Sequence, residues 1–134
     1  PAYLLFGFNT NSTNINSKLI DVMSVDAERG EAIFGAPIFQ GEDQFGKGGV
    51  YNRYITYFKK GVSTVLNYDK DKNIIILDKL ESDIAAPTRH DSYVPSGRMD
   101  GFIKSNGRWM YQRNVVNILK LGDGNAPING VMKP

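Results

Sequence analysis

Short apolar segments separated by polar turns run through most of this chain. Residues 3–8 (Tyr-Leu-Leu-Phe-Gly-Phe) are apolar and aromatic, and residues 9–17 after them are rich in Asn, Ser and Thr. So short an apolar run predicts a buried strand rather than a helix. Asn, Ser and Thr side chains bond to their own backbone in turns, so the polar stretch predicts a loop.

Three pairs of apolar segments predict β-hairpins. They are residues 19–25 and 31–34 around the turn 26–30, residues 63–68 and 74–77 around the turn 69–73, and residues 99–104 and 108–111 around the turn 105–107. The flanks carry β-branched and aromatic side chains, which favour strands. The third turn contains Asn106-Gly107, which supplies the positive φ angles of a tight hairpin turn. The pattern therefore predicts antiparallel sheet.

Residues 50–58 (Val-Tyr-Asn-Arg-Tyr-Ile-Thr-Tyr-Phe) predict one further strand. Successive side chains of a strand point to opposite faces, and here neither face is purely polar. We therefore expect a strand that is covered on both sides, or one whose second face meets a partner.

The longest irregular piece is predicted at residues 82–97, which contain Pro87, Pro95 and Gly97. A loop of this length in a compact domain is often functional or mobile. Residues 115–121 predict a final strand or a short helix. The Gly- and Pro-containing residues 122–134 predict an irregular tail.

These elements together predict a mainly β fold. About eight strands in antiparallel hairpins would form a sandwich or an open, curved barrel. A chain of 134 residues fits one domain, so we expect a single β-rich domain over residues 1–121 and a tail over residues 122–134. No strong helical periodicity separates the strands, which argues against a parallel α/β fold.

Composition excludes several classes of function. The absence of cysteine excludes disulfides, thiolate zinc sites and a cysteine nucleophile. With 16 basic and 14 acidic side chains, the charge is too balanced to indicate nucleic acid as a partner. No apolar run is long enough for a membrane span, and no signal peptide is present. Because the sequence opens with Pro1, we expect a processed or excised piece of a longer protein.

Residues 41–48 come close to a phosphate-binding loop. Gly41, Gly46 and Lys47 have the right spacing, but Gly48 replaces the Ser or Thr that would hold magnesium. Glu42 adds negative charge where phosphate would lie, and a β-rich stretch follows in place of a helix. We interpret the segment as a flexible loop between strands.

Asp69, Asp71 and Asn73 have the spacing that opens a calcium loop. The glycine and glutamate expected downstream in an EF-hand are absent, and Asp and Asn favour hairpin turns for backbone reasons alone. We interpret the segment as a turn. The sequence thus predicts neither a metal site nor a cofactor.

His90 is the only histidine of the chain. A hydrolytic triad would combine it with one of the acids Asp83, Asp91 or Asp100 and with a serine such as Ser92 or Ser96. A triad is defined by geometry, however, and no nucleophile-elbow pattern is present. We interpret His90 as a solvated loop residue and assign no catalytic residue.

Two other groups of side chains fit common surface features. The acids Asp78, Glu81, Asp83, Asp91 and Asp100 are candidates by type for a glycosidase pair. We interpret them as ordinary residues of solvated strands and loops. Aromatic residues interleave with cations at 51–54, 57–60 and 108–111, which would suit a stacking platform. Alternation of core aromatics with exposed cations explains the same pattern.

Two longer stretches carry a family resemblance. Residues 68–80 read as Tyr-Asp, a turn, an aliphatic run and Asp-x-Leu, and residues 93–111 contain Tyr-x-Pro, Asp100-Gly-Phe and Asn-Gly-Arg-Trp109. Together with residues 18–22 and 33–39, they resemble an uncharacterised family of Bacteroidota-type envelope proteins. The resemblance implies a bacterial periplasmic, outer-membrane-associated or secreted location, and a place in the C-terminal β domain of a longer protein. It implies no activity, so it transfers no catalytic residue.

Two of the matched residues can also be interpreted directly. Gly101 lies inside a predicted strand, which indicates a bulge or a close approach of another backbone. Trp109 follows the Asn-Gly turn and is expected to pack across the sheet against Phe102 or an equivalent ring.

The best hypothesis is a non-catalytic binding or structural module that contacts a protein partner or another domain of its own chain. It would use a sheet face or the segment 82–97. The alternatives are a hydrolase of a glycan or ester that uses His90, and a carbohydrate-binding domain that uses Trp109 and exposed tyrosines. The candidate ligand-binding residues are Arg89, His90, Asp91, Tyr93, Trp109 and Tyr111.

Overall fold

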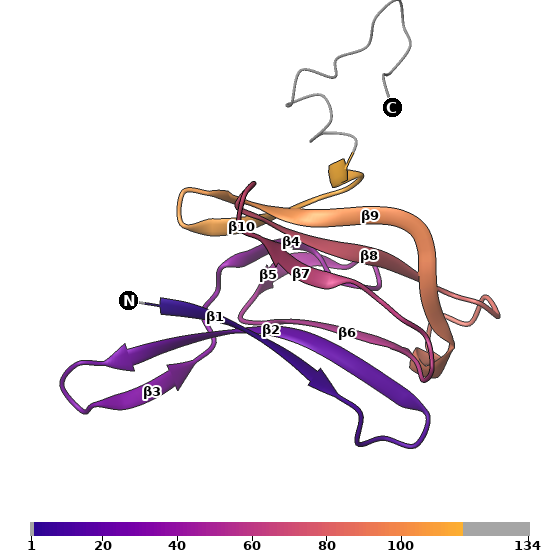
Figure 1. Ribbon diagram of the computed structural model, residues 1–134, viewed down its shortest axis with the longest axis horizontal. Helices are drawn as coiled ribbons and strands as arrows, with labels where there is room; N and C mark the ends of the chain where they lie inside the picture. The colour runs from indigo at the N-terminus through magenta and orange to yellow at the C-terminus, as the bar shows by residue number, and fades with distance from the viewer. Residues whose placement is uncertain (1, 117–134) are drawn as a thin grey trace, which may run out of the picture.

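The computed structural model describes residues 2–116, and in this part of the chain ten strands form two sheets (Figure 1). Sheet A contains β1 (Ala2–Asn9), β2 (Ile15–Asp26), β3 (Glu31–Phe34) and β6 (Tyr54–Lys59). Sheet B contains β4 (Phe39–Glu42), β5 (Gly48–Tyr51), β7 (Leu66–Asp69), β8 (Ile74–Ser82), β9 (Tyr93–Ser105) and β10 (Arg108–Gln112). A short 3-10 helix, η1 (His90–Ser92), precedes β9.

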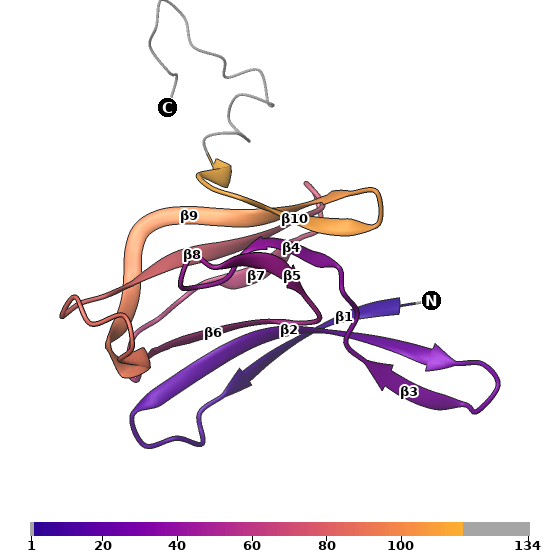
Figure 2. The same ribbon diagram turned by 180° about the vertical axis from the view of Figure 1, so that it is seen from behind.

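The two sheets face each other as a sandwich (Figures 1 and 2). In sheet A, β1 pairs with one edge of β2, while β6 and β3 pair with successive parts of its other edge. Sheet B has the order β5-β4-β10-β9-β8-β7, and its pairs are antiparallel except for β4 with β10, which is parallel. The mainly β, antiparallel-rich fold and its three predicted hairpins are confirmed.

The prediction of a single strand over residues 50–58 is wrong. The chain bends at Asn52 and Arg53, so β5 lies in sheet B and β6 in sheet A. The mixed character of the two faces follows from this crossing, because each half faces a different environment. The residues Phe39–Glu42 also form a strand, β4, that the apolar pattern did not indicate. The fold therefore has more strands than the eight expected.

The predicted loop over residues 82–97 is shorter than expected. Strand β8 continues to Ser82 and β9 begins at Tyr93, which leaves residues 83–92 between the strands. The register of β8 with β9 shifts between Asp78 and Leu80, and beyond this irregularity Leu80 lies opposite Pro95. A proline is tolerated in a strand next to such a disruption because the ladder there is already interrupted.

Residues 3–8 form a strand, as predicted, but the strand is not buried. Tyr3, Leu5, Phe6 and Phe8 keep 37% to 59% of their surface exposed. The reason is the position of β1 at the edge of sheet A, where no described strand pairs with its second edge. Of the predicted element at residues 115–121, Val115 and Val116 are helical. Its remainder and the predicted tail at 122–134 lie outside the described residues.

The core lies between the two sheets. Its buried residues are Ile20, Val22 and Tyr54 from sheet A, and Phe39, Leu66, Ile75, Leu77, Phe102 and Trp109 from sheet B. The ring of Phe102 meets those of Phe39 and Tyr54 edge to face, with centroids 5.6 and 4.9 Å away. Such geometry is favoured by the aromatic quadrupoles.

Trp109 is expected from the sequence to pack across the sheet against Phe102 or an equivalent ring, and the ring it meets is that of Tyr68. Its neighbour on β9 is Lys104, and its ring lies 6.3 Å from that of Tyr68. Phe102 lies instead opposite Tyr111, with 5.3 Å between the ring centroids.

Two glycines allow close approach within sheet B. A Cβ on Gly41 would collide with the Cβ of Tyr111, and Gly41 has a φ of +139° that other residues avoid. A Cβ on Gly101 would collide with the carbonyl oxygen of Ile75, which confirms the close approach predicted at this position.

Candidate functional site

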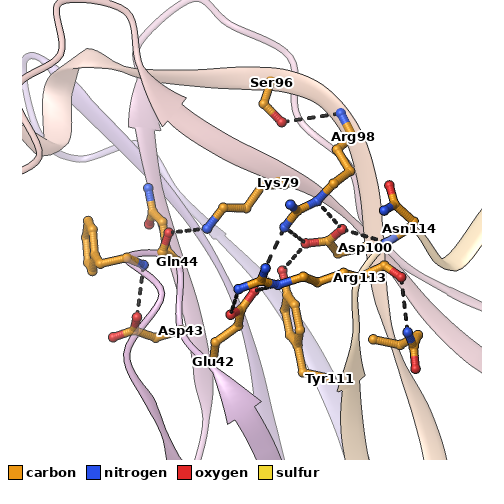
Figure 3. Close-up of polar contacts among 12 residues, drawn as sticks. Glu42, Asp43, Gln44, Lys79, Ser96, Arg98, Asp100, Tyr111, Arg113 and Asn114 are labelled. Carbon is orange, nitrogen blue, oxygen red and sulfur yellow. Dashed lines mark hydrogen bonds and ion pairs between the residues drawn. The ribbon is translucent and has the colours of Figure 1, made fainter.

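One end of the core carries five interacting polar residues (Figure 3). We call this group the charged cluster, and it consists of Glu42, Arg98, Asp100, Tyr111 and Arg113. The residues come from β4, β9, β10 and the turn after β10.

Asp100 is the centre of the charged cluster and has 0% of its surface exposed. Its two carboxylate oxygens accept hydrogen bonds from Arg98 Nε and Nη2 at 2.8 and 2.7 Å. The Tyr111 hydroxyl and the Asn114 backbone amide also donate to it. Burial opposes ionisation, but these donors outweigh it, so the pKa of the Asp100 carboxyl lies below its ordinary value.

Glu42 is the second carboxylate of the charged cluster. Arg113 donates to both of its oxygens at 3.0 and 2.7 Å, and Arg98 Nη2 lies 3.9 Å away. The hydrogen bond from Arg113 lowers the pKa of Glu42 despite partial burial. The Tyr54 hydroxyl donates to the Glu42 backbone carbonyl at 3.2 Å. Burial raises the pKa of both Tyr54 and Tyr111, so both hydroxyls stay protonated near neutral pH.

The charged cluster borders an open hollow of about 630 Å³, whose lining combines glycines of β4, β5 and the turn between them with residues 111–113. The cluster offers no free base or nucleophile to a molecule in this hollow. Each carboxylate already receives an arginine, and each tyrosine hydroxyl already donates to an acceptor. The arrangement ties β4, β9 and β10 together, which is a structural role.

Four of the six candidate ligand-binding residues gather around η1. Arg89 donates to both oxygens of Asp91 at 3.0 and 3.1 Å, and it lowers the pKa of that carboxyl. The His90 ring is stacked against those of Phe45 and Tyr57, with centroids 4.9 and 5.2 Å away. Tyr93 is buried and donates from its hydroxyl to the Pro87 carbonyl at 2.9 Å.

The structure does not assemble the triad considered from sequence. Ser92 Oγ donates to the Arg89 carbonyl at 2.5 Å and lies 2.7 Å from Ser82 Oγ. Asp83 pairs with Lys59 at 3.0 Å, and Asp100 belongs to the charged cluster. The expectation of a solvated histidine is also wrong, because His90 is only partly exposed and its ring is stacked between two others.

The other two candidates, Trp109 and Tyr111, lie on β10 and not with the η1 group. Trp109 is 5% exposed and belongs to the core. Tyr111 is held by Asp100. Neither ring forms an exposed platform for a ligand.

Two sequence motifs are turns. In the segment 41–48, Asp43 Oδ1 accepts from the backbone amides of Phe45 and Lys47, which closes the β4–β5 hairpin in place of a flexible loop. In the segment 69–73, Asp69 Oδ1 accepts from the amide of Asp71. No group of three or more acidic or histidine side chains that could hold a metal occurs within residues 2–116. Nor does this part of the chain contain a helix long and apolar enough to cross a membrane.

Among residues 2–116, no strand pairs with the second edge of β1, and apolar side chains lie around this edge. The residues of β1 read Ala-Tyr-Leu-Leu-Phe-Gly-Phe-Asn and include no charge and no proline. Native proteins usually protect such edges with charges, prolines, bulges or a covering segment.

The direction of the free backbone groups of β1 follows from its neighbours. The amide and carbonyl of Tyr57 point away from β2, because both bond to the Gln44 side chain. Ser17 lies opposite Tyr57, so its own groups point to β1 and bond with Asn9. Alternation along β1 then turns the amides and carbonyls of Leu4, Phe6 and Phe8 to the free edge.

The side chains of the same three residues face sheet B. Leu4 packs against the core, and Phe8 lies 6.2 Å from the buried ring of Phe58. Between β1 and sheet B runs an open hollow of about 580 Å³, which we call the edge groove. Its lining includes Leu4, Phe6, Val22, Tyr68 and Trp109. A smaller hollow of about 170 Å³ continues it past Phe8 to Leu66 of β7.

Sequence reasoning named Tyr111, which belongs to the charged cluster, and Trp109, which lines the edge groove, but it identified neither arrangement as a whole. The sequence pattern of residues 3–8 predicts a buried strand, and this interpretation excludes a free edge at β1. The absence of any charged residue between Ala2 and Asn9 was the signal that could have indicated an interaction edge. For the cluster, the signal was Asp100 between Met99 and the segment Gly101-Phe102-Ile103 of β9. The pair of Glu42 with Arg113 joins residues that are 71 positions apart in the sequence, and nothing local identifies it.

Comparison with models of known protein families, with curated proteins and with solved structures finds no match to this chain.

Proposed function

We propose that this chain is a non-catalytic binding or structural module, and that it binds a polypeptide through the free edge of β1 and the edge groove. The observation that carries the proposal is the combination of unpaired backbone groups with an apolar hollow beside them. An extended peptide can satisfy both at once, since its backbone continues the sheet while alternate side chains enter the groove.

The distribution of polar and apolar groups supports this choice of surface. The carboxylates of the charged cluster and of the η1 group have arginine partners, so they offer little to a ligand. By contrast, Tyr3, Leu5, Phe6 and Phe8 expose apolar surface along one strand. Phe6 and Phe8 lie on the face toward sheet B, beside the edge groove, and exposed apolar surface at a groove marks interaction sites in soluble proteins.

We also propose that the module works in the bacterial envelope or outside the cell. The support is the resemblance of residues 68–80 and 93–111 to the envelope family described above. Secretion of a reporter fused to the native gene would test the location.

A photo-reactive benzoylphenylalanine in place of Phe6 tests the binding surface in the cells that make the protein. We expect a discrete adduct with one polypeptide. The same replacement at Lys70, which is exposed on the β7–β8 turn, is the control and should give none. The captured polypeptide must then bind the purified chain, and Phe6→Lys must weaken that binding at least tenfold while Lys70→Glu leaves it unchanged. Equal labelling at both positions, or none at Phe6, would overturn the proposal.

A further inference from the structure

We infer that the polypeptide bound at the edge of β1 is β1 of a second copy of this chain. The two strands run antiparallel about a two-fold axis at Phe6 and join the two A sheets into one. This inference rests on the proposed function and adds the identity of the partner.

The backbone geometry restricts the register to those that pair Leu4, Phe6 and Phe8 with one another. The amides and carbonyls of Leu4, Phe6 and Phe8 face the free edge, as shown above from the contacts of Tyr57 and Ser17. With Phe6 opposite its own copy, Leu4 lies opposite Phe8 of the second copy. Each of these pairs can exchange two backbone hydrogen bonds.

The side chains of β1 are complementary to themselves in this register. On the face toward sheet B, a phenylalanine meets a phenylalanine and Leu4 meets Phe8. On the outer face, Leu5 meets Gly7 and Tyr3 meets Asn9. Aromatic and aliphatic cross-strand pairs stabilise sheets, and like charges would oppose pairing. Because β1 carries no charge, nothing on the strand repels its own copy.

The edge groove requires the same kind of strand. Its occupant needs apolar side chains at alternate positions on the side that faces Tyr68 and Leu66. Leu4, Phe6 and Phe8 supply this alternation in β1 itself. One strand therefore carries both the surface to be covered and the segment that covers it, as expected of a two-fold interface between identical subunits.

Engineered cysteines test the register, because the chain has none of its own. Opposed Cα atoms in a hydrogen-bonded antiparallel pair lie about 5.5 Å apart, within disulfide range. Under mild oxidation we expect Phe6→Cys to form a disulfide-linked dimer. We expect a mixture of Leu4→Cys and Phe8→Cys chains to cross-link with each other, while either variant alone does not. Phe34→Cys, at a position 55% exposed on β3, is the control and should stay uncross-linked.

Sedimentation equilibrium tests the association without cross-linking. We expect the wild-type chain to dimerise and Phe6→Lys to raise the dimer dissociation constant at least tenfold. Phe34→Lys should dissociate as the wild type does. Circular dichroism of both variants would show that the sheets remain intact.

The outcomes separate the inference from the proposed function. If the wild-type chain is monomeric and the Phe6→Cys variant forms no disulfide-linked dimer, the partner is not a second copy of this chain. If benzoylphenylalanine at Phe6 still captures a different polypeptide in cells, the edge is a docking site for a foreign strand and the proposed function stands. If it captures nothing, both fail. A dimer that Phe34→Lys disrupts and Phe6→Lys does not would move the interface to the β2–β3 hairpin.

Discussion

Asp100 shows how a single charge is accommodated in this core. A fully buried carboxylate is costly unless donors surround it, and here Arg98, Tyr111 and the Asn114 amide supply them. Arg98 remains about one-third exposed, so water shares in its solvation. The Arg98–Asp100 pair therefore stabilises the sheet mainly by supplying hydrogen-bond donors to the buried Asp100 carboxylate.

We expect Asp100→Asn to lower the free energy of unfolding by about 2–4 kcal/mol, because it removes a charge-assisted pair and leaves donors facing one another. Urea denaturation of the purified chain measures the loss. Asp91→Asn, in the solvent-exposed pair with Arg89, is the matched control and should unfold at the wild-type midpoint. If Asp100→Asn and Asp91→Asn lowered the free energy of unfolding equally, the greater structural importance of the buried Asp100 would be contradicted.

Trp109 has the largest side chain of the core. It is 5% exposed, and its ring lies 6.3 Å from that of Tyr68. We expect Trp109→Ala to destabilise the fold by about 3–5 kcal/mol, as for other buried aromatics. Thermal unfolding measures this, and a melting temperature equal to that of the wild type would place Trp109 at an exposed binding surface instead.

At the scale of elements, the two edges of sheet A are treated differently. The edge of β6 is covered, since the buried Gln44 side chain accepts from the Tyr57 amide at 2.7 Å and donates to the Tyr57 carbonyl at 2.6 Å. This one amide group substitutes for a neighbouring strand. Lys79 in turn donates to the Gln44 carbonyl at 2.9 Å, which anchors the turn to β8 (Figure 3). The edge of β1 has no such cover among the described residues.

Gln44→Leu removes the cover of β6 at nearly constant volume. Two partly buried backbone groups of Tyr57 then lose their partners, and we expect a loss of about 3 kcal/mol in unfolding free energy. Hydrogen exchange followed by NMR should show faster exchange of the Tyr57 amide. Gln112→Leu, where the side chain bonds only to the Arg113 carbonyl, is the control. Unchanged protection of Tyr57 in Gln44→Leu would show that the amide pair is dispensable.

At the scale of the whole molecule, the ionisable groups define a pH range of stability. Asp100 and Glu42 have folded pKa values below their ordinary values of 3.8 and 4.5, held there by their arginine partners against burial. The unfolded chain therefore takes up protons first as the pH falls. Tyr54 and Tyr111 have pKa values raised above the ordinary 10.0 by burial, so the unfolded chain ionises first as the pH rises.

We expect the free energy of unfolding to be level at intermediate pH, to fall below about pH 4.5 and to fall again above about pH 10. Urea denaturation across this range measures the profile. Asp100→Asn should flatten the acid limb, and Tyr54→Phe should flatten the alkaline limb while leaving the acid limb unchanged. Stability that increases below pH 4 would contradict the assignment of the low pKa values.

Local chemistry alone determined the hairpins of this protein. The Asn106-Gly107 pair and the polar turns at 26–30 and 69–73 each lie between the strands that they connect, so turn residues and alternation were enough to predict them. The close approach at Gly101 was likewise visible in one residue of one strand.

Tertiary structure decided what lies next to each hairpin. The parallel pairing of β4 with β10 and the charged cluster join segments that are distant in the sequence. The bend at Asn52 and Arg53 carries the chain from sheet B to sheet A. The apolar residues 3–8 are buried only if another strand lies beside them. The local sequence pattern does not show whether such a strand is present. Alternation reveals that a strand has two faces, but only the assembled sheets determine what covers each face and each edge.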